Sequence, residues 1–298
     1  MKNILIIGCG LLGSSLLRRI QKKRIANKIY IYEKSNSNLT KIKRLKLPGK
    51  IVRKLEDGVK NSDLIILCTP MSEYKNLILK MNKFLSTKTI ITDIGSSKLE
   101  SSKIIKKYLR KDVFWTQSHP ITGSEVSGPE HGKHDIFEKK WCVLIKEKNT
   151  KKKHLNLLSS FWKKMGSKIV IMSAEKHDKI FSMTSHLPHL IAYNLVKSAQ
   201  DFEKIQNYDL IKYSAGGLRD FSRIAASNEI MWRDIFFNNK QNISRAIDLF
   251  IKNLNSFKKD INSKNNRSIL KKLIQTKKVR SKIIKLKQDI NKPDFGRN

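Results

Sequence analysis

Acidic residues, cysteines and long apolar runs are all scarce in this chain of 298 residues. The three cysteines, Cys9, Cys68 and Cys142, form no CxxC pair, so neither a disulfide framework nor a zinc site is expected, and such thiols are typical of a reducing cytoplasm. No run approaches the roughly 18 apolar residues that a membrane-spanning helix needs. The apolar start at residues 4–7 is too short for a signal sequence. A cytoplasmic protein is therefore expected.

The shortage of acids leaves 25 Asp and Glu against 62 Lys and Arg, a net charge of +37. This excess could mark a nucleic-acid or anionic-membrane partner, or it could reflect a composition rich in Lys, Ile and Asn. The basic residues are scattered through every segment, whereas nucleic-acid binders gather them on one face and interleave aromatics. We favour the compositional interpretation and expect no nucleic acid and no membrane as partners. A positive field would still attract an anionic small molecule.

The pattern of apolar residues divides the chain near residue 172. Before that point, short Ile- and Val-rich runs alternate with helical stretches, and the nearly continuous runs are typical of parallel strands buried on both faces. This alternation predicts a doubly wound α/β domain of the Rossmann type over residues 1–172. The expected strands are Ile4–Ile7, Ile29–Tyr32, Leu64–Cys68, Thr89–Thr92, Val113–Thr116 and Cys142–Ile145.

Beyond Ala174 only helical periodicity is found, which predicts an all-helical domain over residues 173–298. The Pro293–Gly296 stretch is expected to be irregular. The expected helices are Leu187–Val196, Ile224–Phe237, Ile243–Phe257 and Ser268–Ile290.

A glycine-rich turn follows the first expected strand and opens the first expected helix. Its G-x-G-x-x-G pattern permits a tight turn, close approach of the backbone to a pyrophosphate, and close packing of helix on strand. The free N–H groups of the helix N-terminus then face the phosphates. A plain strand–helix turn is the alternative. We expect a dinucleotide to be bound by Gly8, Gly10, Leu11, Leu12 and Gly13.

The ends of the later strands supply further candidate contacts to a cofactor. Glu33 ends the second strand, where an acid accepts hydrogen bonds from ribose hydroxyls and repels a 2′-phosphate, which favours NAD over NADP. Lys34 argues the other way, because a cation can accept the extra phosphate. Thr69, Pro70 and Asp93 end two more strands, whose carboxyl ends face the cofactor crevice in such sheets. Ordinary β–α turns are the alternative.

Histidines are concentrated in two segments on the substrate side. His119 lies just past an expected strand, and histidine is the side chain best suited to accept a proton near neutral pH. Further along, His177 and Asp178 precede His186 and His189, which lie three apart on one helix face. No third ligand has suitable spacing, so we expect no metal.

A pair of arginines follows the double glycine at residues 216–217. Arg219 and Arg223 lie four apart, so on a helix they would share a face. The planar guanidinium matches the two oxygens of a carboxylate, which makes either arginine a candidate clamp. Ion pairing with Asp220 or Glu229 is the structural alternative.

Together these segments resemble the prephenate/arogenate (cyclohexadienyl) dehydrogenase family. The resemblance implies a Rossmann domain, a helical dimerisation domain, and an active site between them. It also implies oxidative decarboxylation of prephenate to 4-hydroxyphenylpyruvate, of arogenate to tyrosine, or of both, with NAD as hydride acceptor. The motifs that carry it are the glycine turn, D-I-G-S-S-K at 93–98, H-P-I-T-G-S-E-V-S-G-P-E at 119–130, S-H-L-P-H-L-I-A-Y at 185–193, G-G-L-R-D-F-S-R-I-A-A-S-N-E-I-M-W-R-D-I at 216–235, and the closing D-F-G-R.

The resemblance further assigns roles to single residues and implies a homodimer. His119 matches the catalytic histidine that bonds to the ring hydroxyl, and Ser96 matches the serine that supports that hydroxyl and the histidine. His189 and Arg223 match substrate-binding positions, Arg223 for the ring carboxylate. The remaining matches are an acid at the pocket edge, Glu125, and an aromatic that reaches into the partner subunit's site in relatives, Trp232.

Two other function classes remain open at this point. One is a different two-domain Rossmann dehydrogenase, such as a 3-hydroxyacid type, which carries a lysine base on the first helix of its second domain. His119 precedes that domain, which disfavours this alternative. The other is a nucleotide-binding protein that has kept the fold and lost the chemistry, against which the pair His119 and Arg223 argues.

Overall fold

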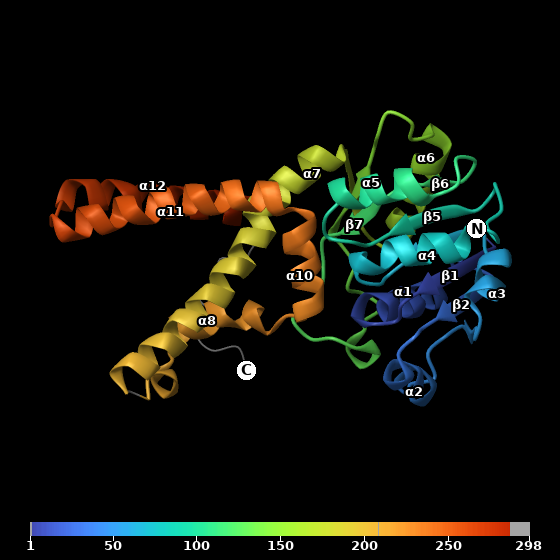
Figure 1. Ribbon diagram of the computed structural model, residues 1–298, viewed down its shortest axis with the longest axis horizontal. Coiled ribbons are helices and arrows are strands. Elements are labelled where there is room, and N and C mark those ends of the chain that lie inside the picture. The colour runs from blue at the N-terminus through green and yellow to red at the C-terminus, as the bar shows by residue number, and fades with distance from the viewer. Residues whose placement is uncertain (1, 208, 287–298) are drawn as a thin grey trace.

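The computed structural model describes residues 2–207 and 209–286 and has two parts, an α/β half and a helical half (Figure 1). The main sheet is parallel throughout, with its strands in the order β3-β2-β1-β4-β5-β6. This is the order of a doubly wound dinucleotide-binding sheet, so the predicted fold class is confirmed. The strands are β1 (Asn3–Ile7), β2 (Lys28–Tyr32), β3 (Lys50–Ile51), β4 (Leu64–Leu67), β5 (Ile90–Asp93) and β6 (Phe114–Trp115).

Helices cover both faces of the main sheet, and successive side chains of a strand point to opposite faces, so side chains on both faces are buried. From β1, Ile4 and Ile6 pack with apolar side chains of α1 and α6, while Leu5 and Ile7 pack with those of α3 and α4. This two-sided burial explains the continuous apolar runs in the sequence. The helices of this half are α1 (Leu11–Lys22), α2 (Asn36–Arg44), α3 (Leu55–Lys60), α4 (Tyr74–Met81), α5 (Leu99–Tyr108) and α6 (Lys152–Lys164), with short 3-10 turns η1 (Met71–Glu73) and η2 (Pro129–His131).

A second, three-stranded sheet departs from the prediction. The sequence predicts Cys142–Ile145 as a further strand of the parallel sheet, but β8 (Trp141–Ile145) lies between β7 (Ser118–Pro120) and β9 (Lys168–Met172) in a separate sheet. It pairs with β7 antiparallel and with β9 parallel. Because β7 is only three residues long, it leaves no periodic signal. This strand carries His119, which lies opposite Val143.

The helical half is built on long helices, of which α11 and α12 run side by side as a projecting hairpin (Figure 1). Residues 287–290 of the expected last helix, the Pro293–Gly296 stretch and the D-F-G-R motif lie outside the described residues. The elements are α7 (Ala174–Phe181), η3 (Ser182–His186), α8 (Leu187–Gln206), η4 (Ile211–Tyr213), α9 (Gly216–Ser222), η5 (Arg223–Ala226), α10 (Glu229–Asn238), α11 (Lys240–Asn262) and α12 (Asn266–Lys285).

Two local features of the helical half were not predicted. The expected helix Ile224–Phe237 is broken, since η5 is a 3-10 turn and Asn228 then caps α10 by accepting a hydrogen bond from the Met231 N–H at 2.9 Å. In addition, η3 is a π-helical turn between α7 and α8. Pro188, in the first turn of α8, would clash with a carbonyl one α-helical turn earlier, and the wider π turn relieves that conflict.

The two halves are joined where α7 and α10 meet the carboxyl end of the main sheet (Figure 1). Trp232 and Ile235 of α10 belong to the apolar cluster that covers the α4 side of the sheet. Asp234 accepts a hydrogen bond from the Ser72 N–H at 2.9 Å. None of the helices in the described part of the chain combines the length and apolar character needed to cross a membrane.

Candidate active site

The glycine turn between β1 and α1 has the geometry of a dinucleotide cradle. Gly8 has a φ of +87°, which side chains disfavour, and a Cβ on Gly13 would lie 2.2 Å from the Gly8 carbonyl oxygen. By contrast, nothing lies within 4 Å of where a Cβ on Gly10 would sit. The turn is therefore closed toward the sheet and open outward at its second glycine, beside the backbone of Leu11 and Leu12 at the start of α1.

Glu33 lies directly beside this turn. Its Oε2 accepts a hydrogen bond from the Cys9 N–H at 2.7 Å, and its Oε1 accepts one from the Ser35 N–H at 2.8 Å. Lys34 points elsewhere, because its Nζ lies 2.9 Å from the Glu73 Oε2, and this pairing raises the pKa of Lys34. The negative charge at the turn is thus Glu33, and the neighbouring cation is engaged by another acid.

Thr69 and Asp93 end neighbouring strands but differ in what they offer. The Thr69 Oγ1 is buried without a hydrogen-bond partner beside the glycine turn, so a polar ligand atom there would satisfy it. Pro70 follows it and begins η1. The Asp93 carboxylate has no exposed surface and accepts bonds from Lys98, Tyr74, Gly95 and Trp115. Protein donors occupy both oxygens of Asp93, which leaves little room for a cofactor contact. A direct contact between Asp93 and a cofactor stays a prediction.

Lys98 is a residue of this site to which the sequence analysis gave no role. Its side chain is fully buried, and its Nζ donates to the Asp93 Oδ2 and to the Ser118 carbonyl, each at 2.7 Å. A buried charge is tolerated only when it is paired in this way. The only sequence signal was an acid and a lysine five residues apart around a strand end.

His119 on β7 is the first member of a chain of buried polar groups. Its Nδ1 lies 2.8 Å from the His177 Nε2, and the His177 Nδ1 lies 2.8 Å from the Asp178 Oδ1. His177 and Asp178 are fully buried, whereas His119 is half-buried. Burial lowers the pKa of His119 well below 6.5, and the nearby His177 and Lys98 lower it further. His119 is therefore a neutral imidazole at neutral pH.

Ser96 lies in the loop between β5 and α5, where its backbone lies beside buried His186. Burial lowers the pKa of His186 to about 4, against the opposing effects of Asp178 and the Ser96 backbone. The Asn239 Nδ2 lies 2.8 Å from the Asp178 carbonyl oxygen and 3.0 Å from the His186 Nδ1. Asn239, which precedes α11 and was not predicted, thereby holds α7 and η3 together.

His189 and Trp232 stack on each other, with ring centroids 3.8 Å apart and an angle of 24° between the planes. The His189 Nδ1–H donates to the Ser185 carbonyl at 2.9 Å, which leaves Nε2 as the free nitrogen, and burial lowers the pKa of His189. Trp232 is 5% exposed. The ring lies against a histidine of its own chain, and its reach into a partner subunit's site, which the resemblance implied, stays a prediction.

Arg223 pairs with Glu125, the two predicted side chains being joined at 3.1 Å between Nη1 and Oε2. Neither alternative partner, Asp220 or Glu229, takes this place. Arg219 points to solvent, with its Nε 4.0 Å from the Asp220 Oδ1. Arg223 also lowers the pKa of His189, after the larger effect of burial. The structure therefore brings Arg223, Glu125 and His189 into one electrostatic environment and leaves Arg219 outside it.

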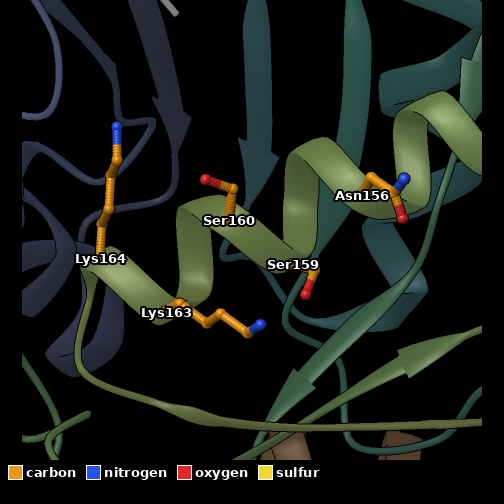
Figure 2. A pocket seen from close by; sticks show the side chains of 5 residues that line it. All are labelled: Asn156, Ser159, Ser160, Lys163 and Lys164. Carbon is orange, nitrogen blue, oxygen red and sulfur yellow. The ribbon is translucent and has the colours of Figure 1, made fainter.

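Two hollows in the surface lie away from these residues. One of about 510 Å³ on the outer side of α6 contains none of the predicted site residues, and it is lined by Asn156, Ser159, Ser160, Lys163 and Lys164 (Figure 2). Within residues 2–207 and 209–286, no cluster of three His, Cys, Asp or Glu side chains could hold a metal ion.

Two family models match the chain in succession. The model for the nucleotide-binding domain of prephenate dehydrogenase matches residues 16–171, and the model for the dimerization domain of prephenate dehydrogenase matches residues 173–276. Among curated proteins, a cyclohexadienyl dehydrogenase of Zymomonas mobilis is 32% identical over 94% of this chain and 95% of its own length. A prephenate dehydrogenase of Bacillus subtilis is 30% identical over 86% of this chain and 69% of its own length.

Solved structures agree with these matches. The prephenate dehydrogenase of A. aeolicus, in complex with hydroxyphenyl propionate and NAD+, superposes with a TM-score of 0.88 at 34% identity, covering 95% of this chain and 98% of that one. The arogenate dehydrogenase of Synechocystis shares the fold, with a TM-score of 0.76 at 22% identity, covering 94% and 99% of the two chains. With both of its halves matched in order and relatives aligned over nearly its whole length, the chain belongs to the prephenate dehydrogenase family.

Proposed function

We propose that this chain catalyses the NAD-dependent oxidative decarboxylation of prephenate to 4-hydroxyphenylpyruvate, of arogenate to tyrosine, or of both, in tyrosine biosynthesis. The observation that carries the proposal is His119, a neutral imidazole bonded to buried His177, in the same α/β half as the dinucleotide cradle. The names of the relatives, one a cyclohexadienyl dehydrogenase and another a prephenate dehydrogenase, support the same substrate class.

The cradle would hold NAD through the backbone of residues 8–13, with Glu33 on the ribose hydroxyls and the unpartnered Thr69 hydroxyl within reach. NAD, when bound, supplies the acceptor for the hydride that leaves C4 of the ring. NAD is favoured over NADP because Glu33 would repel the 2′-phosphate of NADP. Lys34, the neighbouring cation that could accept this phosphate, is already paired with Glu73.

On the substrate side, the proposed residues act on the ring hydroxyl and the ring carboxylate, the two groups of the substrate that react. Neutral His119 takes the proton of the ring hydroxyl as the C4–O bond gains carbonyl character. Ser96 supports that hydroxyl, and Arg223 holds the ring carboxylate in place with Glu125 at the pocket edge. Carbon dioxide then leaves C1 and the ring becomes aromatic. Aromatisation makes the reaction effectively irreversible, so the protein mainly has to position hydride donor and base.

The rival 3-hydroxyacid type of dehydrogenase needs a lysine base on the first helix of the helical half. That helix, α7, carries Lys176 and Lys179, which are both exposed, and Lys179 is paired with Glu175. The buried side of the same helix carries His177 and Asp178 instead. This placement supports a histidine rather than a lysine as the base.

The first test is NADH formation with prephenate and with arogenate, measured for the wild type and for His119→Asn. The variant should lose nearly all turnover yet bind NAD as before, because His119 acts on the substrate hydroxyl. Only the neutral form is active and burial lowers the pKa of His119 well below 6.5, so wild-type kcat/KM should stay level through pH 6.5 and fall only in more acidic solution. His131→Asn, which alters an exposed histidine, is the control. Near-normal turnover of His119→Asn would exclude it as the base.

Cofactor preference tests the role of Glu33. The wild type should have a higher kcat/KM with NAD than with NADP, and Glu33→Ser should narrow that ratio by removing the charge that repels the 2′-phosphate. Glu100→Ser, which removes an acid from α5, should leave the ratio unchanged. A wild-type enzyme that prefers NADP would contradict the assignment.

Arg223→Ala tests the carboxylate clamp. A charge-assisted bidentate contact contributes about 2–4 kcal/mol, so the Michaelis constant for prephenate should rise by roughly 30- to 1000-fold while the NAD dissociation constant barely changes. Arg223→Lys should recover only part of the loss, because an ammonium cannot offer two parallel donors. Arg219→Ala is the matched control. If Arg219→Ala raised the constant and Arg223→Ala did not, the clamp would belong to Arg219.

A homodimer built on the helical half follows from the apolar side chains it exposes. They include Leu195, Val196 and Phe202 on α8, Leu249 and Leu254 on α11, and Leu270, Leu273 and Ile274 on α12. The second family model describes a dimerization domain, which supports a second copy of this chain as the cover. Light scattering should give about twice the chain mass of 34.5 kDa at micromolar concentration, and Leu254→Lys should reduce it. A wild-type monomer would refute the dimer.

A further inference from the structure

The geometry points to His177 and Asp178 as positioning residues that keep the proton of neutral His119 on Nδ1, so that Nε2 holds a lone pair for the substrate. The inference deepens the proposed function, since it rests on His119 as the base. A neutral imidazole carries its proton on either nitrogen, and only one of these two forms can accept a proton at Nε2. The surrounding groups decide which form is present.

Asp178 is fixed as an acceptor by its partners. Its Oδ1 lies 2.8 Å from the Lys98 backbone nitrogen, and its Oδ2 lies 2.8 Å from the Leu99 backbone nitrogen. Both are N–H groups at the start of α5, where they have no partner within the helix and can only donate. A carboxylate held by two such donors accepts from its third neighbour as well. The His177 Nδ1, 2.8 Å from the Asp178 Oδ1, therefore carries a hydrogen.

The ring of His177 links Asp178 to His119. This side chain is fully buried, and burial lowers its pKa well below 6.5, with Lys98 and His186 adding to the effect. A neutral imidazole with a hydrogen on Nδ1 has only a lone pair on Nε2. Because that Nε2 lies 2.8 Å from the His119 Nδ1, His119 must donate, and its own proton is on Nδ1.

The outer nitrogen of His119 is then free to act. In the described part of the chain, no group forms a hydrogen bond to the His119 Nε2, and the side chain is half-buried rather than enclosed. Phe181 packs against both rings, with centroid distances of 4.4 Å to His177 and 5.1 Å to His119. An apolar neighbour offers the two imidazoles no competing hydrogen bond, so it leaves the bonds from His119 to His177 and from His177 to Asp178 undisturbed.

The same arrangement serves the charged state that follows proton transfer. Once Nε2 has taken the proton of the substrate hydroxyl, His119 is an imidazolium that donates from both nitrogens. Its Nδ1–H already bonds to the His177 Nε2, and the negative charge of Asp178 stands behind His177. No proton has to move between the three side chains. The positioning residues therefore help in both states without changing their own protonation.

Nitrogen-15 NMR on full-length protein with labelled histidines tests the inference directly. Two-bond correlations between ring protons and nitrogens distinguish the two neutral forms, and the signals of His119 are identified by their loss in His119→Asn. The resting wild type should have His119 with its hydrogen on Nδ1. His177→Phe keeps a ring but removes the acceptor, so a form with hydrogen on Nε2 should appear.

Kinetics separate positioning from a general loss of structure. His177→Phe should lower kcat with prephenate by roughly 10- to 100-fold while the Michaelis constant and the NAD dissociation constant stay near wild type. His177→Gln offers an amide oxygen near the lost nitrogen and should recover part of kcat and of the Nδ1–H form. His154→Phe, the same substitution at a half-buried histidine of α6, should change neither readout.

The outcomes distinguish this inference from the function on which it rests. A wild-type His119 with its hydrogen on Nε2 would overturn the inference, and so would a His177→Phe enzyme with unchanged NMR signals and unchanged kcat. If the NMR result were as expected but His119→Asn retained turnover, the positioning would stand and the proposed base would fall. If His177→Phe did not fold, the wild-type spectrum and His177→Gln would still decide the matter.

Discussion

The ammonium group of Lys98 has no exposed surface, and its requirement for partners organises the carboxyl end of the sheet. Its partners are the Asp93 carboxylate, at the end of β5, and the Ser118 carbonyl, next to His119 on β7. Through these bonds one side chain ties the main sheet to the second sheet next to His119. The backbone N–H of the same residue holds Asp178, so the helical half is attached at this point as well. Loss of either charge would leave the other buried and unpaired.

The division of the chain into two halves corresponds to a division of chemical tasks. In the proposed function, the α/β half supplies the dinucleotide cradle, at the carboxyl end of β1, and the base His119, on β7 of the second sheet. The helical half supplies the groups behind the base from α7, and His189 and Arg223 from α8 and η5. Each half alone would lack part of the site. The buried contacts between them, which include Asp178 with α5 and Asp234 with η1, therefore hold the proposed site together as well as the fold.

Features carried by local sequence were predictable, and features carried by long-range contacts were not. The glycine turn, the acid at the end of β2 and the change from strand to helix patterning each depend on neighbouring residues, which is why the fold class could be predicted. The pairing of β7 with β8 joins residues more than 20 positions apart, and the bond from Lys98 to Asp178 spans 80. The break at residues 223–226 was missed because apolar spacing continues across it. The roles of single site residues stay predictions.

The π turn between α7 and α8 sets the directions in which the side chains of α8 point relative to those of α7. Each residue of an α-helix advances the rotation by about 100°, so one residue added to or removed from this turn would rotate α8 by that angle relative to α7. His177 would keep its place against β7, while His189 would be carried to another side of the helix. The segment can therefore vary in side chains far more readily than in length. An insertion or deletion there would turn His189 away from His177 while leaving both helices intact.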